Sequence, residues 1–261
     1  MSSPGQKIAV QVRPATRADI EDLVRINDEA FSPGIISKLL YPNGMPDDAK
    51  AKMAADLAEV IDAAGTGPSA NHGSEPKAYE NHVVVAEIIS QEEQSNPETV
   101  AFARFEVWRK PRSETEWKAA EPLSSMKAEG ANNELLDVFM GGVHEMRLRN
   151  MKGDPGICLR TLVCTPKRGR LGAGSALLSW GNELADREGL PIWLEASPKG
   201  YGLYRKFGFE DVDMLETDLQ RWEAVRKPDE NWGANCAVER FGVAREGVYR
   251  SVGMRRPAAK G

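Results

Sequence analysis

Residues 161–213 read TLVCTPKRGRLGAGSALLSWGNELADREGLPIWLEASPKGYGLYRKFGFEDVD, and the order of elements in this stretch decides the fold. The stretch continues an apolar, β-favouring run that starts at Leu159 and stops before Pro166, because proline cannot donate a hydrogen bond to a sheet. Basic and glycine residues then dominate positions 167–174. This pattern predicts a buried strand that ends in a glycine-rich, positively charged turn.

A helix, a second strand and a second helix follow this turn. Apolar residues recur at helical spacing from Ala176 to Leu184, and Gly189 is typical of a helix end because glycine adopts the left-handed conformation at low cost. Residues 192–196 form a short apolar run, which indicates a buried strand. Ser197 is a favourable cap for a helix whose first position is proline.

The turn has the composition of a phosphate-binding loop. The first N–H groups of a helix lack internal partners and carry the positive end of its dipole, and glycine lets an anion approach them. A Walker P-loop requires a lysine after its last glycine, whereas Gly174 is followed by Ser175. A Rossmann fingerprint requires a third glycine where Leu177 stands, although Glu195 lies near the distance of its ribose-binding acid. The pyrophosphate loop of a coenzyme A enzyme fits without such changes.

The turn resembles the signature of the GNAT superfamily of N-acetyltransferases, Gln/Arg-x-x-Gly-x-Gly/Ala. Gly172 and Gly174 match the two glycine positions, and Gly169 stands where the family has Gln or Arg. Arg168 and Arg170 flank that departure. The family grips the cofactor pyrophosphate mostly through backbone N–H groups, so the departure affects a side-chain contact more than the loop.

The stretch after the loop helix carries the second half of the resemblance. Residues 194–210 read LEASPKGYGLYRKFGFE and are similar to the family's strand, its Asn-x-x-Ala-x-x-Leu-Tyr helix and its Gly-Phe strand entry. Ser197 replaces the asparagine and Gly200 the alanine. Four positions fit the pattern: Leu203, Tyr204, Gly208 and Phe209. Two linked motifs in the right order are far more specific than an isolated Gly-x-Gly.

The resemblance implies an α/β fold in a single acetyltransferase domain over residues 1–261. The expected sheet is mixed and mostly antiparallel, with about seven strands flanked by helices and splayed between the central parallel strands. The cofactor-binding core is expected at 157–213. An insertion at 109–154, between the third and fourth strands, is expected to cover the acceptor side or to form a dimer surface.

The resemblance also implies the activity. An N-acetyltransferase of this type moves the acetyl group of acetyl-CoA to an amine by direct attack in a ternary complex, with no metal. Two other hypotheses stay open. The replaced positions Gly169 and Ser197 suggest a protein that binds CoA without catalysis, and the glycine turn alone also suits a nucleotide-binding protein.

Roles for single residues follow from the same resemblance. Tyr204 matches the general acid that protonates the departing thiolate, with Tyr201 as the substitute. The base is predicted to be a strand carboxylate, Glu195 or Glu106, or a chain of ordered waters. Loop cations are expected to pair with cofactor phosphates. The full set of predicted cofactor-binding residues is Leu162, Val163, Cys164, Lys167, Arg168, Gly169, Arg170, Leu171, Gly172, Ala173, Gly174, Ser175, Ser197, Gly200 and Tyr204.

Composition excludes several classes of protein. The formal net charge of −5 argues against a general nucleic-acid binder, so the basic turn suits one anionic cofactor better than a polyanion. No apolar run is long enough to cross a membrane, and residues 1–7 lack the apolar centre of a secretory signal. We therefore expect a cytoplasmic protein that binds neither nucleic acid nor membranes. The resemblance implies a small-molecule or peptide amine as second substrate, and we expect a monomer or homodimer.

Cysteine and histidine placement gives no metal site. The three cysteines follow no ligand spacing and are expected to be reduced, buried, small apolar residues. His72, His82 and His144 are equally scattered.

The rest of the chain supplies the remaining elements. Helical spacing predicts helices at 47–64 and around 135–146, and residues 33–46 are expected to form a loop that either lines the acceptor pocket or anchors locally in the core. Alternating or apolar patterns predict strands at 8–12, 82–89, 100–108, 212–219 and 241–254, the second and third of them an antiparallel pair.

Overall fold

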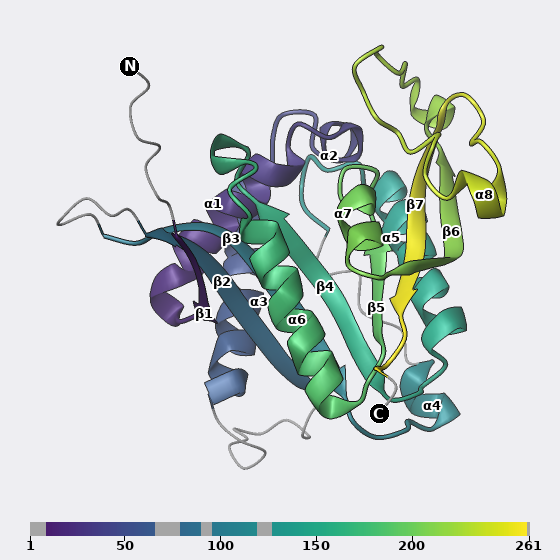
Figure 1. Cartoon of the computed structure of the whole chain (residues 1–261). Helices are drawn as coiled ribbons and strands as arrows, with labels where there is room; N and C mark the ends of the chain where they lie inside the picture. The colour runs from purple at the N-terminus through teal and green to yellow at the C-terminus, as the bar shows by residue number, and fades with distance from the viewer. Residues whose placement is uncertain (1–8, 66–78, 90–95, 119–126, 260–261) are drawn as a thin grey trace, which may run out of the picture.

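The computed structural model describes residues 9–65, 79–89, 96–118 and 127–259. A seven-stranded sheet runs through the molecule in the order β1-β2-β3-β4-β5-β7-β6 (Figure 1). Among the strands of the described residues, only β4 and β5 pair in parallel, which confirms the predicted mixed, mostly antiparallel sheet. The strands are β1 Ala9–Pro14, β2 Glu80–Ile89, β3 Glu98–Trp108, β4 Gly156–Cys164, β5 Ile192–Ala196, β6 Glu210–Asp218 and β7 Val248–Arg256.

Helices cover both faces of the sheet. The long helix α6 crosses one face over β2, β3 and β4, and α1, α3 and α5 lie on the other (Figure 1). The helices are α1 Ile20–Phe31, α2 Ile35–Leu40, α3 Asp47–Gly65, α4 Glu114–Trp117, α5 Asn133–Met151, α6 Ala173–Glu188, α7 Tyr201–Lys206 and α8 Val238–Phe241.

The alternation of side chains along β3 builds a core on each face. Ala103, Phe105 and Val107 pack under α6, whereas Phe102 packs with α1 and α3. Helix α6 approaches the sheet closely at Gly181, where an added Cβ would lie 2.5 Å from Cζ of Phe105. Glycine is therefore required at this point of the helix by the distance to the sheet.

The two central strands separate after three paired residues. The parallel register runs from Ile157↔Ile192 to Leu159↔Leu194, whereas the other edge of β5 pairs with β7 along its whole length, through Glu195 to Ala196. On the other side of β4, a register shift places Arg160 as an extra residue opposite β3. The far half of β4 therefore keeps one free edge within the described sheet, as the splayed fold requires.

The segment 109–154 between β3 and β4 contributes α4 and α5, and its residues 119–126 lie outside the described part. Helix α5 packs on the β5–β6 end of the sheet, where Met146 contacts the cluster around Cys158 and Trp193. The predicted helices at 47–64 and 135–146 are confirmed as α3 and α5. His72, most of the connection at 65–76 and the chain start at 1–7 also lie outside the described residues.

Two sequence predictions are wrong in detail. The expected loop at 33–46 contains the helix α2, whose apolar side chains pack with Leu135, Leu219 and Trp232. This packing supports the anchor interpretation. The last strand begins at Val248 rather than at 241, because the positive φ of Gly242 and Gly247 keeps the preceding segment irregular.

Candidate functional site

The glycine-rich turn leaves β4 and starts α6 at the point where β4 and β5 have separated. Its chain direction reverses through two left-handed residues, Arg170 with φ of 66° and Gly172 with φ of 87°. An added Cβ on Gly172 would meet nothing within 4 Å, so its backbone conformation, and not crowding, requires glycine there. The first helical hydrogen bond runs from Ala176 N–H to the Gly172 carbonyl, 2.9 Å. The N–H groups of residues 173–175 stand outside the helical ladder.

The second glycine of the turn lies against the end of β4. A Cβ on Gly174 would be 3.3 Å from Cys164 Sγ, 3.5 Å from Leu203 Cδ2 and 3.7 Å from Leu162 Cδ2. The Gly174 N–H donates to the Cys164 thiol, whose pKa is raised by burial. The start of α6, the end of β4 and α7 therefore meet at one point.

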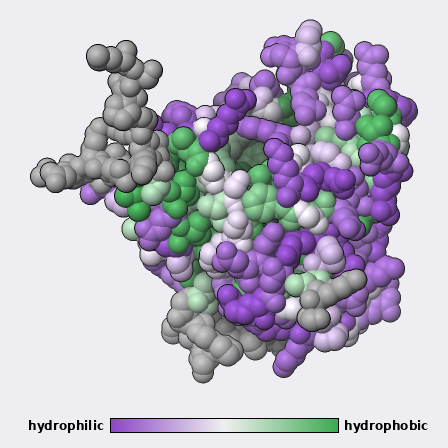
Figure 2. All heavy atoms as spheres, viewed as in Figure 1, coloured by the Kyte–Doolittle hydropathy of each residue, from purple (hydrophilic) through white to green (hydrophobic). Residues whose placement is uncertain are grey.

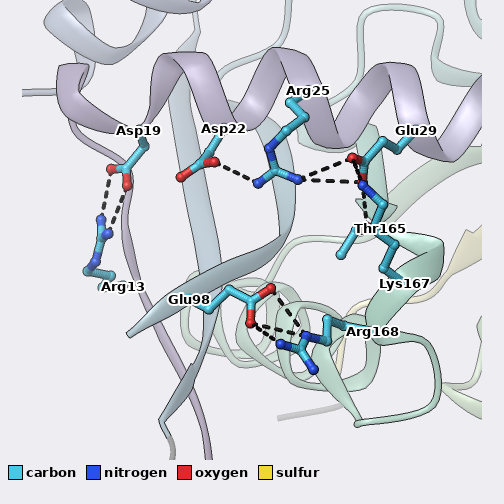
Figure 3. Close-up of polar contacts among 9 residues, drawn as sticks. All are labelled: Arg13, Asp19, Asp22, Arg25, Glu29, Glu98, Thr165, Lys167 and Arg168. Atoms are coloured by element: carbon cyan, nitrogen blue, oxygen red, sulfur yellow. Dashed lines mark hydrogen bonds and ion pairs between the residues drawn. The ribbon is translucent and has the colours of Figure 1, made fainter. Parts of the chain in front are cut away.

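Two of the loop cations are engaged by carboxylates on neighbouring elements (Figure 3). Lys167 forms an ion pair of 2.6 Å with Glu29 on α1, and the Thr165 hydroxyl donates to the other oxygen of Glu29 at 2.6 Å. These contacts lower the pKa of Glu29 to about 2, with Lys167 the largest cause. Arg168 binds Glu98 at the start of β3, 2.8 Å. The two ion pairs therefore hold the loop against α1 and β3.

Two other cations at this end of the sheet remain open. Arg170 and Lys199 are exposed, and neither has an ion pair or side-chain hydrogen bond within the described ranges. Burial raises the pKa of the Cys164 thiol and the charge of Lys199 acts against this shift, so Lys199 lies near the end of β4. These two side chains could therefore bind an anion without breaking an ion pair within the described ranges.

Tyr204 is held on α7 by close packing at Gly200. A Cβ on Gly200 would lie 2.9 Å from Cε2 of Tyr204, so glycine in place of the family's alanine lets the ring rest on the backbone. The ring also lies edge-on to Phe209, with centroids 5.8 Å apart. Ser197, which replaces the family's asparagine, accepts the Gly200 N–H at 3.3 Å and caps the turn before α7.

The hydroxyl of Tyr204 is available for chemistry. Its side chain is only 8% exposed, and within the described residues its hydroxyl has no hydrogen-bond partner. Burial, followed by the nearby Cys164 and Glu195, raises the pKa of Tyr204 above its usual value. Tyr201 differs because its hydroxyl donates to Asp211 on β6 at 2.9 Å.

The two predicted base candidates are both buried and paired. Arg147 on α5 donates to both oxygens of Glu195, at 2.9 and 3.1 Å. Glu106 on β3 lies 3.3 Å from Arg104 and 3.6 Å from Arg160. Both carboxylates belong to the sheet face opposite α6.

Figure 2 shows the surface hollowed between the start of α6 and α7, with hydrophobic atoms at the floor of the hollow.

No model of a protein family matches the sequence, and no curated protein matches it. Solved structures do match over almost the whole chain. Arylalkylamine N-acetyltransferase 2 from Aedes aegypti has a TM-score of 0.56 at 10% identity, covering 95% of this chain and 98% of that one.

Two further insect enzymes give the same picture. The mosquito arylalkylamine N-acetyltransferase like 5b has a TM-score of 0.54 at 13% identity, covering 95% of this chain and 99% of that one. The polyamine N-acetyltransferase of Drosophila melanogaster also reaches 0.54 at 13%, covering 95% and 98%. This protein has the GNAT fold.

The cofactor-binding residues predicted from the sequence lie in one region of the GNAT fold. The cofactor residues predicted from the sequence lie on the end of β4, the turn, the first turn of α6 and the entry to α7. Val163 points to α1 and α3, whereas Leu162, Cys164 and Leu171 lie at the edge of the core under α6. Ser175 is half-buried in the first turn of α6.

Sequence reasoning missed two residues at this end of the GNAT sheet. Lys199 lies inside the second motif, where a basic residue before Gly200 was the available signal. Arg147 lies on α5 and belongs to no motif, so only the packing of α5 shows that it contacts Glu195. In the described part of the chain, no group of three or more metal-ligating side chains gathers, and no helix is long and apolar enough to span a membrane.

Proposed function

We propose that the protein is a GNAT-type N-acetyltransferase that moves the acetyl group of acetyl-CoA to a small-molecule or peptide amine in a ternary complex. One observation carries this proposal. The left-handed glycine turn that opens α6 lies at the separated ends of β4 and β5, together with a buried tyrosine whose hydroxyl has no partner among the described residues. The three free cysteines fit the reducing, cytoplasmic compartment expected from the sequence.

The cofactor would bind with its pyrophosphate at the start of α6. The N–H groups of residues 173–175 and the positive helix end attract the anion. Arg170 supplies a cation whose engagement breaks no existing ion pair, whereas Lys167 would have to leave Glu29. The pantetheine arm would then follow the free edge of β4 into the gap beside β5.

The reaction needs one attack and two proton transfers. A backbone N–H near Val163 or Cys164 would polarise the thioester carbonyl while the neutral amine attacks its carbon. The C–N bond forms, the C–S bond breaks, and Tyr204 gives its proton to the departing thiolate. The raised pKa of Tyr204 keeps that proton in place at neutral pH.

The proton of the attacking amine is the other half of the chemistry. An alkylamine is mostly protonated at pH 7, and producing the neutral form costs about 4 kcal/mol. We propose that the ammonium proton passes to solvent, and that Glu195 accepts the proton that the nitrogen loses once the C–N bond has formed, directly or through a water. Glu195 stands where β5 leaves β4, and its charge acts on Tyr204 from the opposite face of the sheet.

Thermal unfolding with acetyl-CoA, CoA, ATP and NADH tests the cofactor assignment. A ligand at a hundred times its dissociation constant stabilises the protein by about 2.7 kcal/mol, which is a readable shift. We expect a shift with acetyl-CoA and CoA that disappears in Gly172→Glu. Gly189→Glu is the matched control, because Gly189 is also left-handed, meets open space and lies at the other end of α6.

The outcome separates the hypotheses left open by the sequence. A shift with ATP or NADH alone would support a nucleotide-binding protein. A shift with CoA and acetyl-CoA, but no thiol release with phenylethylamine, spermidine or a lysine peptide, would support CoA binding without catalysis. Thiol release that requires one of these amines establishes the transferase.

A further inference from the structure

The insertion helix α5 reaches the site through one buried ion pair. Arg147 Nε donates to Glu195 Oε1 at 2.9 Å, and Arg147 Nη2 donates to Oε2 at 3.1 Å. The side chains of the two residues are only 11% and 8% exposed. Trp193, two residues earlier on β5, donates its indole N–H to Oε1 at 3.0 Å. The carboxylate is therefore fixed by three donors from two elements.

The position of Glu195 places this carboxylate beside the gap in the sheet. Glu195 is the first residue of β5 after its pairing with β4 has ended. Its neighbours Leu194 and Ala196 point into the core under α6, so Glu195 points to the opposite face, toward α5. Its charge also acts on the hydroxyl of Tyr204. Tyr204 packs in the core under α6 with Leu194 and Ala196, so Tyr204 and Glu195 lie on opposite faces of the sheet.

The three donors do not use the whole hydrogen-bonding capacity of the carboxylate. Two donors bind Oε1 and one binds Oε2, whereas an ionised carboxylate offers about four acceptor positions. Oε2 is the less occupied oxygen. A buried carboxylate needs charged or hydrogen-bonding partners, and α5 supplies the charged one through Arg147.

We propose that Arg147 is a positioning residue, which holds Glu195 turned so that Oε2 receives an N–H of the acceptor amine. The inference rests on the proposed function and extends it, because it gives the insertion helix a part in acceptor use. Arg147 touches neither substrate. Its removal should change turnover through Glu195 and leave cofactor binding unchanged.

The test compares Arg147→Ala with Arg149→Ala in the full chain. Arg149 is two residues along α5 and also ties the helix to the sheet, but its ion pair is with Asp213 on β6, at 2.7 Å, and not with Glu195. Each variant is assayed with acetyl-CoA and the amine that wild-type protein acetylates best. Thermal shift with CoA, kcat, KM for the amine and rescue by added guanidinium are measured.

We expect kcat of Arg147→Ala to fall about 100-fold, the loss typical of a misplaced reacting group. The CoA shift should equal that of Arg149→Ala, and millimolar guanidinium should restore part of kcat only in Arg147→Ala. If Arg147→Ala does not fold, Arg147→Lys is compared with Arg149→Lys, and the same difference in kcat is expected.

Equal kcat in the Arg147 and Arg149 variants would overturn the inference while leaving the proposed function intact. A loss that appears as weakened CoA binding would overturn it as well, because Arg147 would then act on the cofactor. Wild-type protein that binds CoA and acetylates none of the amines overturns the proposed function, and this inference with it.

Discussion

The ring and the hydroxyl of Tyr204 have different roles: the ring packs in the core, and the hydroxyl is the proposed proton donor. Its ring is packed against Gly200 and Phe209, so the ring explains its burial, whereas nothing among the described residues explains its hydroxyl. Tyr201, three residues earlier, shows the contrast, because its hydroxyl is bound to Asp211. Removing each hydroxyl should therefore have opposite effects on stability and turnover.

Tyr204→Phe should lower kcat about 100-fold or more, because the thiolate loses its proton donor, and should leave the free energy of unfolding almost unchanged. Tyr201→Phe should keep kcat and lose about 1 kcal/mol of stability with its hydrogen bond. Steady-state kinetics and urea unfolding of both variants measure these effects. The reverse pattern would assign the acid to Tyr201.

At the scale of elements, the sequence predicts the segments in which local backbone geometry restricts the residue type. Gly172 is required by a positive φ, and Gly174 lies where a Cβ would fit only tightly against Cys164, so both leave a readable motif. Arg147 contacts Glu195, which lies 48 positions further along the chain, and no local sequence pattern predicts such a contact. Helix α2 was missed for a related reason, since its apolar residues pack against α5 and a distant C-terminal segment.

The packing of α6 on the sheet gives a prediction at the same scale. Gly181→Ala should destabilise the protein by about 1–2 kcal/mol, although alanine favours helices, because the new Cβ would overlap the fully buried ring of Phe105. Gly141→Ala in the middle of α5 is the control. Its Cβ meets nothing within 4 Å, so it should stabilise by about 0.5–1 kcal/mol. Urea unfolding measures both, and a stabilised Gly181→Ala would contradict the close approach.

Across the whole molecule, ion pairs fasten α1 at both of its ends (Figure 3). Just before the helix, Asp19 receives both terminal nitrogens of Arg13 on β1, and Arg13 also binds Glu87 on β2. Near its end, Glu29 binds Lys167 and Thr165 of the cofactor turn. The first helix, the sheet edge and the turn are thus joined by two carboxylates.

These two carboxylates predict how stability depends on pH. Hydrogen bonds from Arg13 lower the pKa of Asp19 to about 2, and Lys167 lowers the pKa of Glu29 to about 2. Because the unfolded-state values lie near 4, their stabilisation is complete at neutral pH and is lost as pH falls from about 4 to about 2. The free energy of unfolding, measured with urea at pH 7, 5 and 3, should change little between pH 7 and pH 5 and should fall clearly at pH 3.

The variant Asp19→Asn should be less stable than wild type at pH 7 by about 1–2 kcal/mol, after screening of this partly exposed pair. Its free energy of unfolding should also fall less on acidification. An equal loss in wild type and Asp19→Asn would show that the acid response of the molecule arises elsewhere.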